Sequence, residues 1–374
     1  MGTLFQRKYK ISHVWQARGS YEYRTAIDLD MKCVTDSNTK AFLFHNQVLV
    51  RACYSADRFR RELRALTSVD HPSIPQLRAA FVASLSDPKP AANMLLMEPA
   101  TITAEQFWDA YVDDQAMLLN VLTGLTQDVI QGLVACQSFG IVHNGLRPFS
   151  IMYFPDPSSH DAPIVEELEY PGHWKIVGFD VSCSIGDMFV PKYIDFAGAE
   201  VVRAIMSSRP CRATPYIDVF SFGRCLQFFL YAHRITDYSA DFYPGMMAML
   251  GKPALDRKDT MGRQAQYVST RIDRMKYLSQ GKQPLYEVDK IPRISGPWRE
   301  LLRATLQREP NARASPKKIL EFLNAFSTAA SKEDIDTAAT RVLSDLDESP
   351  LVDSDEITLG INGGFDPLSL SLHL

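Results

Sequence analysis

The chain has 374 residues, of which 46% are hydrophobic and 22% are charged, a composition typical of one two-lobed globular domain or two small ones. The formal net charge of −4 argues against a sequence-independent nucleic-acid binder, which needs a surplus of basic side chains. No stretch approaches the roughly 20 apolar residues that a membrane span requires. We therefore expect neither nucleic acid as a partner nor direct insertion into a membrane.

The six cysteines are scattered along the chain, without the paired spacing of a zinc site. A free cysteine packs as a small apolar side chain, and this is the role expected for them. Reduced thiols predict a cytoplasmic protein, with the nucleus as the alternative compartment.

The first hundred residues predict a β-rich region that one helix interrupts. From residue 56 to 67 the apolar side chains Phe59, Leu63 and Leu66 recur at helical spacing, and Ser55 can cap the start of that helix. Short strands are expected at residues 9–17, 22–30, 47–53, 77–85 and 93–98.

After residue 99 the pattern changes to helices, the longest of which is expected at 117–139. Two short strands follow, at 151–154 and 174–177. The segment 155–172 between them is rich in Pro, Ser, Asp and Glu, which predicts an exposed insertion. Further helices are expected at 217–233, in the 240s, at 297–307 and at 316–326.

Beyond residue 326 the composition becomes acidic, and we expect a flexible tail. The tail ends with leucines that alternate with Ser and His, namely Leu368, Leu370, Leu372 and Leu374. Such a period-two stripe is suited to pairing with the edge of a sheet, and a frayed terminus is the alternative.

From residue 143 onward, five short motifs follow one another at plausible distances. They read HNGLRPFSI at 143–151, WKIVGFD at 174–180, GAE at 198–200, DVFSFG at 218–223 and REPNAR at 308–313. In this order they resemble the catalytic loop (H-R-D-L-K-P-x-N-I), the D-F-G turn and the A-P-E, D-V-W-S-x-G and D-P-x-x-R motifs of protein kinases. The chain therefore resembles the protein kinase superfamily over about residues 9–326.

This resemblance implies an α+β, bilobal protein-kinase-like fold. A small β-rich N-lobe would occupy residues 1–100, a larger helical C-lobe residues 101–326, and the acidic tail residues 327–374. The resemblance also implies that Arg313 pairs with Glu200 and that Asp218 braces the backbone of the catalytic loop.

By the same resemblance, a vestigial nucleotide cleft is expected. Arg51 stands at the position of the third-strand lysine, Glu62 at that of its helical partner, and Met97 and Glu98 at the gatekeeper and first hinge positions. In the phosphate loop only one glycine survives. The residues of this cleft are Gly19, Arg51, Glu62, Met97, Glu98 and Asp180.

The positions that carry kinase chemistry hold unsuitable residues. Gly145 stands where the catalytic base belongs, Ser150 at the second-metal asparagine and Gly178 at the first-metal aspartate, whereas Arg147 replaces the catalytic-loop lysine and keeps its charge. Phosphoryl transfer depends on such positioned charges and metal ions, so we expect no catalytic residue and no metal site.

Two further residues leave alternatives open. In the order Gly-Phe-Asp, Asp180 is either a turn residue that hydrogen-bonds its own backbone or, in a shifted loop, a magnesium ligand. His143 is expected to be a packing and hydrogen-bonding residue of the scaffold, with an acid or base role as the alternative.

The prediction is therefore a pseudokinase and not an enzyme. The run WKIVGFD is similar to that of the SCY-like pseudokinases, which implies a scaffolding or regulatory role with protein partners such as an active kinase or the trafficking machinery. No cofactor is expected, although ATP could bind without magnesium-dependent turnover. The alternatives are a weak or atypical ATP-dependent kinase that uses Asp180 and Arg51, and a switch that binds ATP without catalysis.

Overall fold

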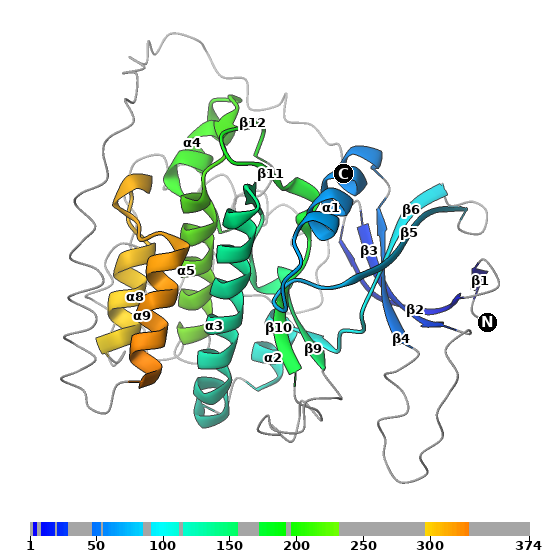
Figure 1. Cartoon of the computed structure of the whole chain (residues 1–374), viewed down its shortest axis with the longest axis horizontal. Coiled ribbons are helices and arrows are strands. Elements are labelled where there is room, and N and C mark those ends of the chain that lie inside the picture. Colours follow the sequence, from blue (N-terminus) through cyan, green and yellow to red (C-terminus); the bar gives the residue numbers. More distant parts are fainter. Residues whose placement is uncertain are drawn as a thin grey trace, which may run out of the picture.

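The computed structural model of the chain describes residues 3–5, 9–18, 21–28, 47–53, 55–84, 91–111, 115–155, 172–191, 196–231 and 296–328. Within these residues a six-stranded sheet lies on one side of the molecule and most of the helices lie on the other (Figure 1). Gly19, residues 156–171 of the predicted insertion, the helix in the 240s and residues 329–374 of the acidic tail fall outside the described residues.

The large sheet is antiparallel throughout, with the strand order β1-β2-β3-β4-β6-β5. Its β4 strand is flanked on both sides, and Val48, Leu49 and Val50 of that strand are all buried. Five of the six strands were expected from the sequence. The strands are β1 (Thr3–Phe5), β2 (Tyr9–Arg18), β3 (Tyr21–Asp28), β4 (Gln47–Cys53), β5 (Leu77–Ser84) and β6 (Ala91–Met97).

Helix α1 (Ala56–Ser68) joins this sheet to the rest of the molecule (Figure 1). It buries Glu62, Ala65 and Leu66. The expected capping bond from Ser55 is absent: Ser55 occupies the N-cap position with an extended backbone, but its side chain makes no capping hydrogen bond. The predicted helix is therefore confirmed, and the reason given for its start is wrong.

The helices after residue 103 pack side by side, with α3 next to α5 and α9, and α5 next to α8 (Figure 1). A close approach of α5 to α8 depends on Gly223, because a Cβ atom there would lie 2.3 Å from Oγ1 of Thr305. The helices are α2 (Ala104–Ala110), α3 (Gln115–Ser138), α4 (Ala199–Met206), α5 (Pro215–Tyr231), α8 (Gly296–Thr305) and α9 (Pro316–Thr328).

Small antiparallel sheets and single 3-10 turns hold the loops between these helices. The sheets pair β10 with β9 and β9 with β7, β11 with β8, and β12 with β13. The strands are β7 (Ile102–Thr103), β8 (Ile141–Val142), β9 (Ile151–Pro155), β10 (Gly172–Ile176), β11 (Cys183–Ser184), β12 (Met188–Phe189) and β13 (Cys211–Arg212). The 3-10 turns are η2 (Pro148–Ser150), η4 (Phe179–Val181) and η8 (Pro310–Ala312).

One hydrophobic cluster runs from the large sheet through the helices, and it includes Leu49 and Leu95 of the sheet as well as Phe322 of α9. Inside it, the indole nitrogen of Trp108 donates a hydrogen bond of 2.9 Å to the carbonyl oxygen of Phe229. The chain is thus α+β, as expected. Among the described residues, no helix is both long and apolar enough to cross a membrane, and the five described cysteines are free.

Candidate functional site

The loop after β8 is held by the side chain of Asp218 from the first turn of α5. The Asp218 carboxylate accepts hydrogen bonds from the backbone nitrogens of His143, at 2.7 Å, and of Asn144, at 2.8 Å. Burial raises the pKa of Asp218 to about 7, and these two backbone donors oppose the rise. The predicted bracing of the loop by Asp218 is confirmed. It fixes Asn144 in a left-handed conformation, with φ of 58°.

His143 is buried beneath this loop and uses both ring nitrogens. Its Nδ1 accepts a hydrogen bond from the backbone nitrogen of Gly145 at 3.2 Å, so Nε2 carries the proton and donates to the carbonyl oxygen of Val177 at 3.1 Å. Burial lowers the pKa of His143 to about 4. The imidazole is therefore neutral near pH 7 and serves the packing and hydrogen-bonding role that was expected.

Three positions, Gly145, Ser150 and Gly178, are expected to lack the catalytic side chains of a kinase, and they have different roles in the structure. Gly145 is buried, and Gly178 has the left-handed values φ 87° and ψ 46°, at the start of η4. The hydroxyl of Ser150 donates to the carbonyl oxygen of Arg147 at 2.9 Å and accepts from the backbone nitrogen of Arg147 at the same distance. Two of these positions thus lack a side chain, and the third uses its hydroxyl within its own turn.

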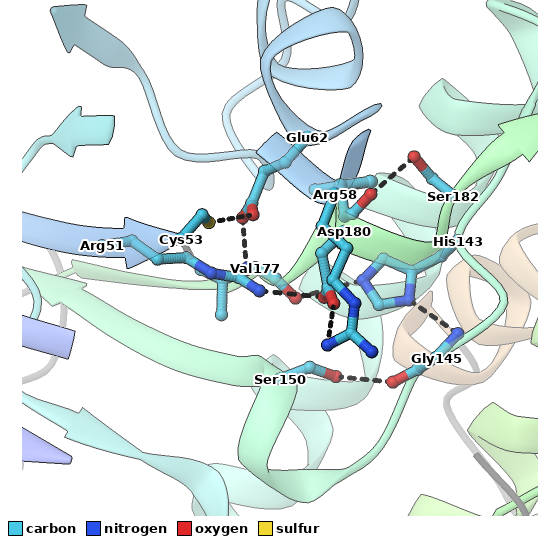
Figure 2. Close-up of polar contacts among 11 residues, drawn as sticks. Arg51, Cys53, Arg58, Glu62, His143, Gly145, Ser150, Val177, Asp180 and Ser182 are labelled. Carbon is cyan, nitrogen blue, oxygen red and sulfur yellow. Dashed lines mark hydrogen bonds and ion pairs between the residues drawn. The ribbon is translucent and has the colours of Figure 1, made fainter. Parts of the chain in front are cut away.

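Arg51 of β4 lies at the centre of a group of charged side chains that we call the ion cluster: Arg51, Arg58, Glu62 and Asp180. The Arg51 guanidinium pairs with Glu62 of α1 and, at 2.9 Å, with Asp180 of η4 (Figure 2). Arg58 lies 3.6 Å from the other carboxylate oxygen of Asp180. The side chains of Arg51 and Glu62 are completely buried. The cluster therefore joins the sheet, α1 and η4.

Burial acts differently on the two carboxyl groups of the ion cluster. Burial alone would raise the pKa of Asp180, but the charge and hydrogen bond of Arg51, helped by Arg58, hold it below its ordinary value. For Glu62, burial dominates over Arg51 and raises the pKa to about 7. Asp180 thus carries the negative charge that the two arginines face.

Pairing between Arg51 and Glu62 was anticipated from the sequence, whereas the contacts of Asp180 with Arg51 and Arg58 were missed. Neither role expected for Asp180 includes an ion pair with α1. A signal was present in α1, where Arg58 precedes Glu62 by one helical turn and so lies on the same side of the helix. The sequence does not indicate that η4 approaches that side of α1.

The predicted gatekeeper and hinge residues lie at the end of β6. Met97 is fully buried, opposite Leu49 of β4 and Leu77 of β5. The carboxylate of Glu98 accepts hydrogen bonds of 2.7 Å from the Lys175 ammonium of β10 and from the backbone nitrogen of Gln76. Glu98 therefore connects the end of the large sheet to the strand that leads into η4.

Arg313 and Glu200 form the pair that the sequence predicted. The two guanidinium nitrogens bind the two carboxylate oxygens at 2.6 and 2.8 Å. Arg313 also donates to the carbonyl oxygens of Gln307, Tyr216 and Arg308, and its guanidinium lies 4.7 Å from the centre of the Phe220 ring. This buried arginine ties the start of α4 to α5 and to the loop before α9.

No group of three or more His, Cys, Asp or Glu side chains in the described part of the chain is arranged to hold a metal ion. The described residues of the expected nucleotide cleft are brought together in two places. Arg51, Glu62 and Asp180 meet in the ion cluster, and Met97 and Glu98 lie at the end of β6.

Comparison with known proteins gives a weak similarity. No family model matches the chain. A probable myosin light chain kinase from Dictyostelium discoideum is 24% identical over 194 residues, which are 51% of this chain and 55% of that relative. The chain thus spans about half the length of the curated relative it matches. This similarity points to a distant kinase-like relationship and to nothing more specific.

Proposed function

We propose that the chain is a catalytically inactive, kinase-like domain with the bilobal kinase fold, which acts by binding other proteins as a scaffold or an allosteric regulator. The observation that carries this proposal is the ion cluster. Arg51, at the position of the nucleotide-binding lysine, is fully buried and has its guanidinium on Glu62 and Asp180.

The other kinase-motif positions also support the proposal of a catalytically inactive domain. A kinase gains most of its rate from metal ions and placed charges, because phosphoryl transfer needs little covalent help. Gly145 has no side chain to orient a hydroxyl, and Gly178 has none to bind a metal. Asp180 is the carboxylate nearest to that position in the chain, and Arg51 and Arg58 face it. To bind magnesium it would have to leave both.

The ion cluster also supplies a reason why the fold needs no ligand. The two arginines and two carboxyl groups of the ion cluster pair with one another between β4, α1 and η4, where a kinase would bring metal and phosphate charges. A domain whose conformation is fixed in this way presents the same surface to a partner protein at all times. The WKIVGFD run, similar to that of SCY-like pseudokinases, favours an active kinase or the trafficking machinery as the partner class.

The test is phosphate transfer from radiolabelled ATP, with magnesium, to a mixed protein substrate. We expect the wild-type chain to transfer no more phosphate than the Asp180→Asn variant, with Asp187→Asn, an exposed aspartate on the following turn, as the matched control. Transfer that disappears in Asp180→Asn and persists in Asp187→Asn would contradict the proposal and identify an atypical kinase.

A second measurement separates the scaffold from a nucleotide-binding switch. A ligand at 100 times its Kd stabilises a folded protein by about 2.7 kcal/mol, which is visible as a rise in melting temperature. We expect no rise with ATP, with or without magnesium, because the Arg51 side chain is completely buried and is bound by Asp180 as well as by Glu62. A rise without phosphate transfer would replace the scaffold by the switch.

A further inference from the structure

Five large apolar side chains among the described residues are exposed, and four of them lie in one place. Ile185, Met188 and Val190, which are 41 to 69% exposed, belong to the segment that contains β11 and β12. Phe139 follows the last residue of α3, and the backbone nitrogen of Ile185 donates a hydrogen bond of 2.8 Å to the carbonyl oxygen of the next residue, Gly140. We call Phe139, Ile185, Met188 and Val190 the apolar patch. Exposed apolar side chains that gather in this way mark a surface that another segment covers.

Arginines flank the apolar patch on two sides. Arg64 of α1 donates a hydrogen bond of 3.1 Å to the hydroxyl of Ser184 in β11, and Arg61 lies one helical turn earlier on the same side of α1. On the other side, Arg212 of β13 lies directly opposite Met188 of β12. The strand β11 lies between α1 and β12 (Figure 1). All three arginines are exposed, and none of them forms an ion pair with a carboxylate of the described residues.

The acidic side chains near the patch do not cancel this charge. Asp187 lies in the turn before β12, where its carboxylate accepts a hydrogen bond of 3.1 Å from the backbone nitrogen of Ser184. Asp57 and Arg60 of α1 pair with each other and so add no net charge. Three arginines thus face one aspartate. A segment that fits this surface should combine apolar side chains with several carboxylates and few basic groups.

The chain itself contains a segment of this composition within the acidic tail. Residues 342–359 include seven Val, Leu or Ile residues and no basic residue. The acidic residues between them are Asp345, Asp347, Glu348, Asp353, Asp355 and Glu356. The segment therefore complements both the apolar patch and the arginines beside it.

The position of this segment in the chain allows it to reach the patch. Helix α9 ends at Thr328, so 13 residues connect it to residue 342. Thirteen extended residues span up to about 45 Å. Helix α3, against which α9 packs, has 24 residues and is about 36 Å long. The connection is therefore longer than the whole of α3, at whose end Phe139 lies.

We propose that residues 342–359 dock on the apolar patch, with their apolar side chains over Ile185 and Met188 and their carboxylates toward Arg61, Arg64 and Arg212. The acidic tail is then an internal ligand of this surface, and a partner protein that binds there has to displace it. The inference goes beyond the proposed function, because it requires neither the loss of catalysis nor the absence of nucleotide binding.

The test uses the full chain with a photo-crosslinking phenylalanine derivative at Met188 and, in a separate variant, at Ile185. After irradiation, gel electrophoresis separates single chains from linked pairs, and mass spectrometry identifies the cross-linked peptide. We expect cross-links to residues 342–359 within single chains. Their yield should fall as salt is added, because salt screens the attraction between exposed charges.

Charge reversal tests the role of the arginines, at the salt concentration that halves the wild-type yield. Arg64→Glu and Arg212→Glu should each lower the ratio of docked to undocked chains about fivefold, which is equivalent to about 1 kcal/mol. The matched control is Lys317→Glu, the same change of charge at an exposed residue of α9, and it should keep the wild-type yield. Changing the six acidic residues of the segment to their amides should remove most of the cross-links.

Three results would overturn the inference. The first is that neither position cross-links to residues 342–359. The second is that cross-links to these residues form between two chains and not within one, which would make the patch an interface between copies. The third is an equal loss in Arg64→Glu and Lys317→Glu, which would reduce the effect to general charge.

Discussion

At position 178 the backbone takes a conformation that glycine adopts without cost. With φ of 87°, any residue with a Cβ atom is strained there, and the strain is about 1–2 kcal/mol for an ordinary L-residue. The sequence indicated only that a metal ligand is missing at Gly178. The structure adds that this glycine sets the direction in which η4, and with it Asp180, enters the ion cluster.

Replacing Gly178 with Ala is therefore expected to lower the free energy of unfolding by about 1–2 kcal/mol, measured by denaturant titration. The matched control is Gly124→Ala in α3, where a new Cβ atom meets nothing within 4 Å. This control should raise the free energy of unfolding by up to about 1 kcal/mol, because glycine is a poor helix former. A neutral Gly178→Ala variant would contradict the assigned strain.

The contacts between motif residues were predictable, because the kinase resemblance identifies both partners of each contact. Arg51 with Glu62, Arg313 with Glu200, and Asp218 with the loop all follow from motif letters, and each contact is present. The contact between Arg58 and Asp180 was not predictable in this way. It depends on how closely α1 approaches η4, which no local pattern encodes.

At the scale of helices and strands, the hydrophobic periodicity predicted the positions of most elements. It did not predict the interactions that start them. The strand β1 was missed because three residues are too short for a pattern and gain their partner only from the register of Thr3–Phe5 with β2. The start of α2 carries a signal that was overlooked: Thr103 and Gln106 form a capping box, which is readable from sequence.

The contact that joins α4 to the segment before α9 is expected to be one of the strongest single contributions to stability. Arg313→Ala should cost about 3–5 kcal/mol, because it leaves the Glu200 carboxylate and three carbonyl oxygens without their donor. Arg313→Lys should recover little of this, since an ammonium cannot reproduce the fork of donors.

The control for that experiment is Arg303→Ala, which breaks a more exposed pair with Glu300 on α8. Exposed pairs of this kind contribute about 0–1 kcal/mol, so the variant should unfold at nearly the denaturant concentration of the wild type. Similar losses in both variants would show that the pair of Arg313 and Glu200 has no special role.

For the molecule as a whole, the change from strands to helices near residue 99 was predictable, because hydrophobic period and helix length change there. The class α+β followed from it. The order of the large sheet, with β6 between β4 and β5, could not be obtained in the same way, because register depends on partners distant in the chain.

The stability of the protein at low pH depends on two buried groups whose contributions change with pH in opposite directions. Because burial lowers the pKa of His143 to about 4, its contribution to stability is present above its ordinary pKa of 6.5 and is lost as the pH falls toward 4. Asp218, with its pKa raised to about 7, acts in the opposite sense: its contribution is present at low pH and is lost as the pH rises through 7.

A His143→Gln variant isolates the first of these effects. It removes the group that takes up a proton on unfolding, so the difference in melting temperature between the wild type and the variant should shrink as the pH is lowered from 7 to 4. Lost packing and hydrogen bonds add an offset that does not depend on pH. A difference that stays constant over this range would show that His143 does not titrate on unfolding.

The bridge between Lys175 and Glu98 has a mechanical consequence. Lys175 lies five positions before Asp180, and both are bound by residues of the strand-rich part, Lys175 by Glu98 and Asp180 by Arg51. Rocking of the large sheet against the helices would have to stretch both links together. Both links therefore oppose a change in the angle between the large sheet and the helices.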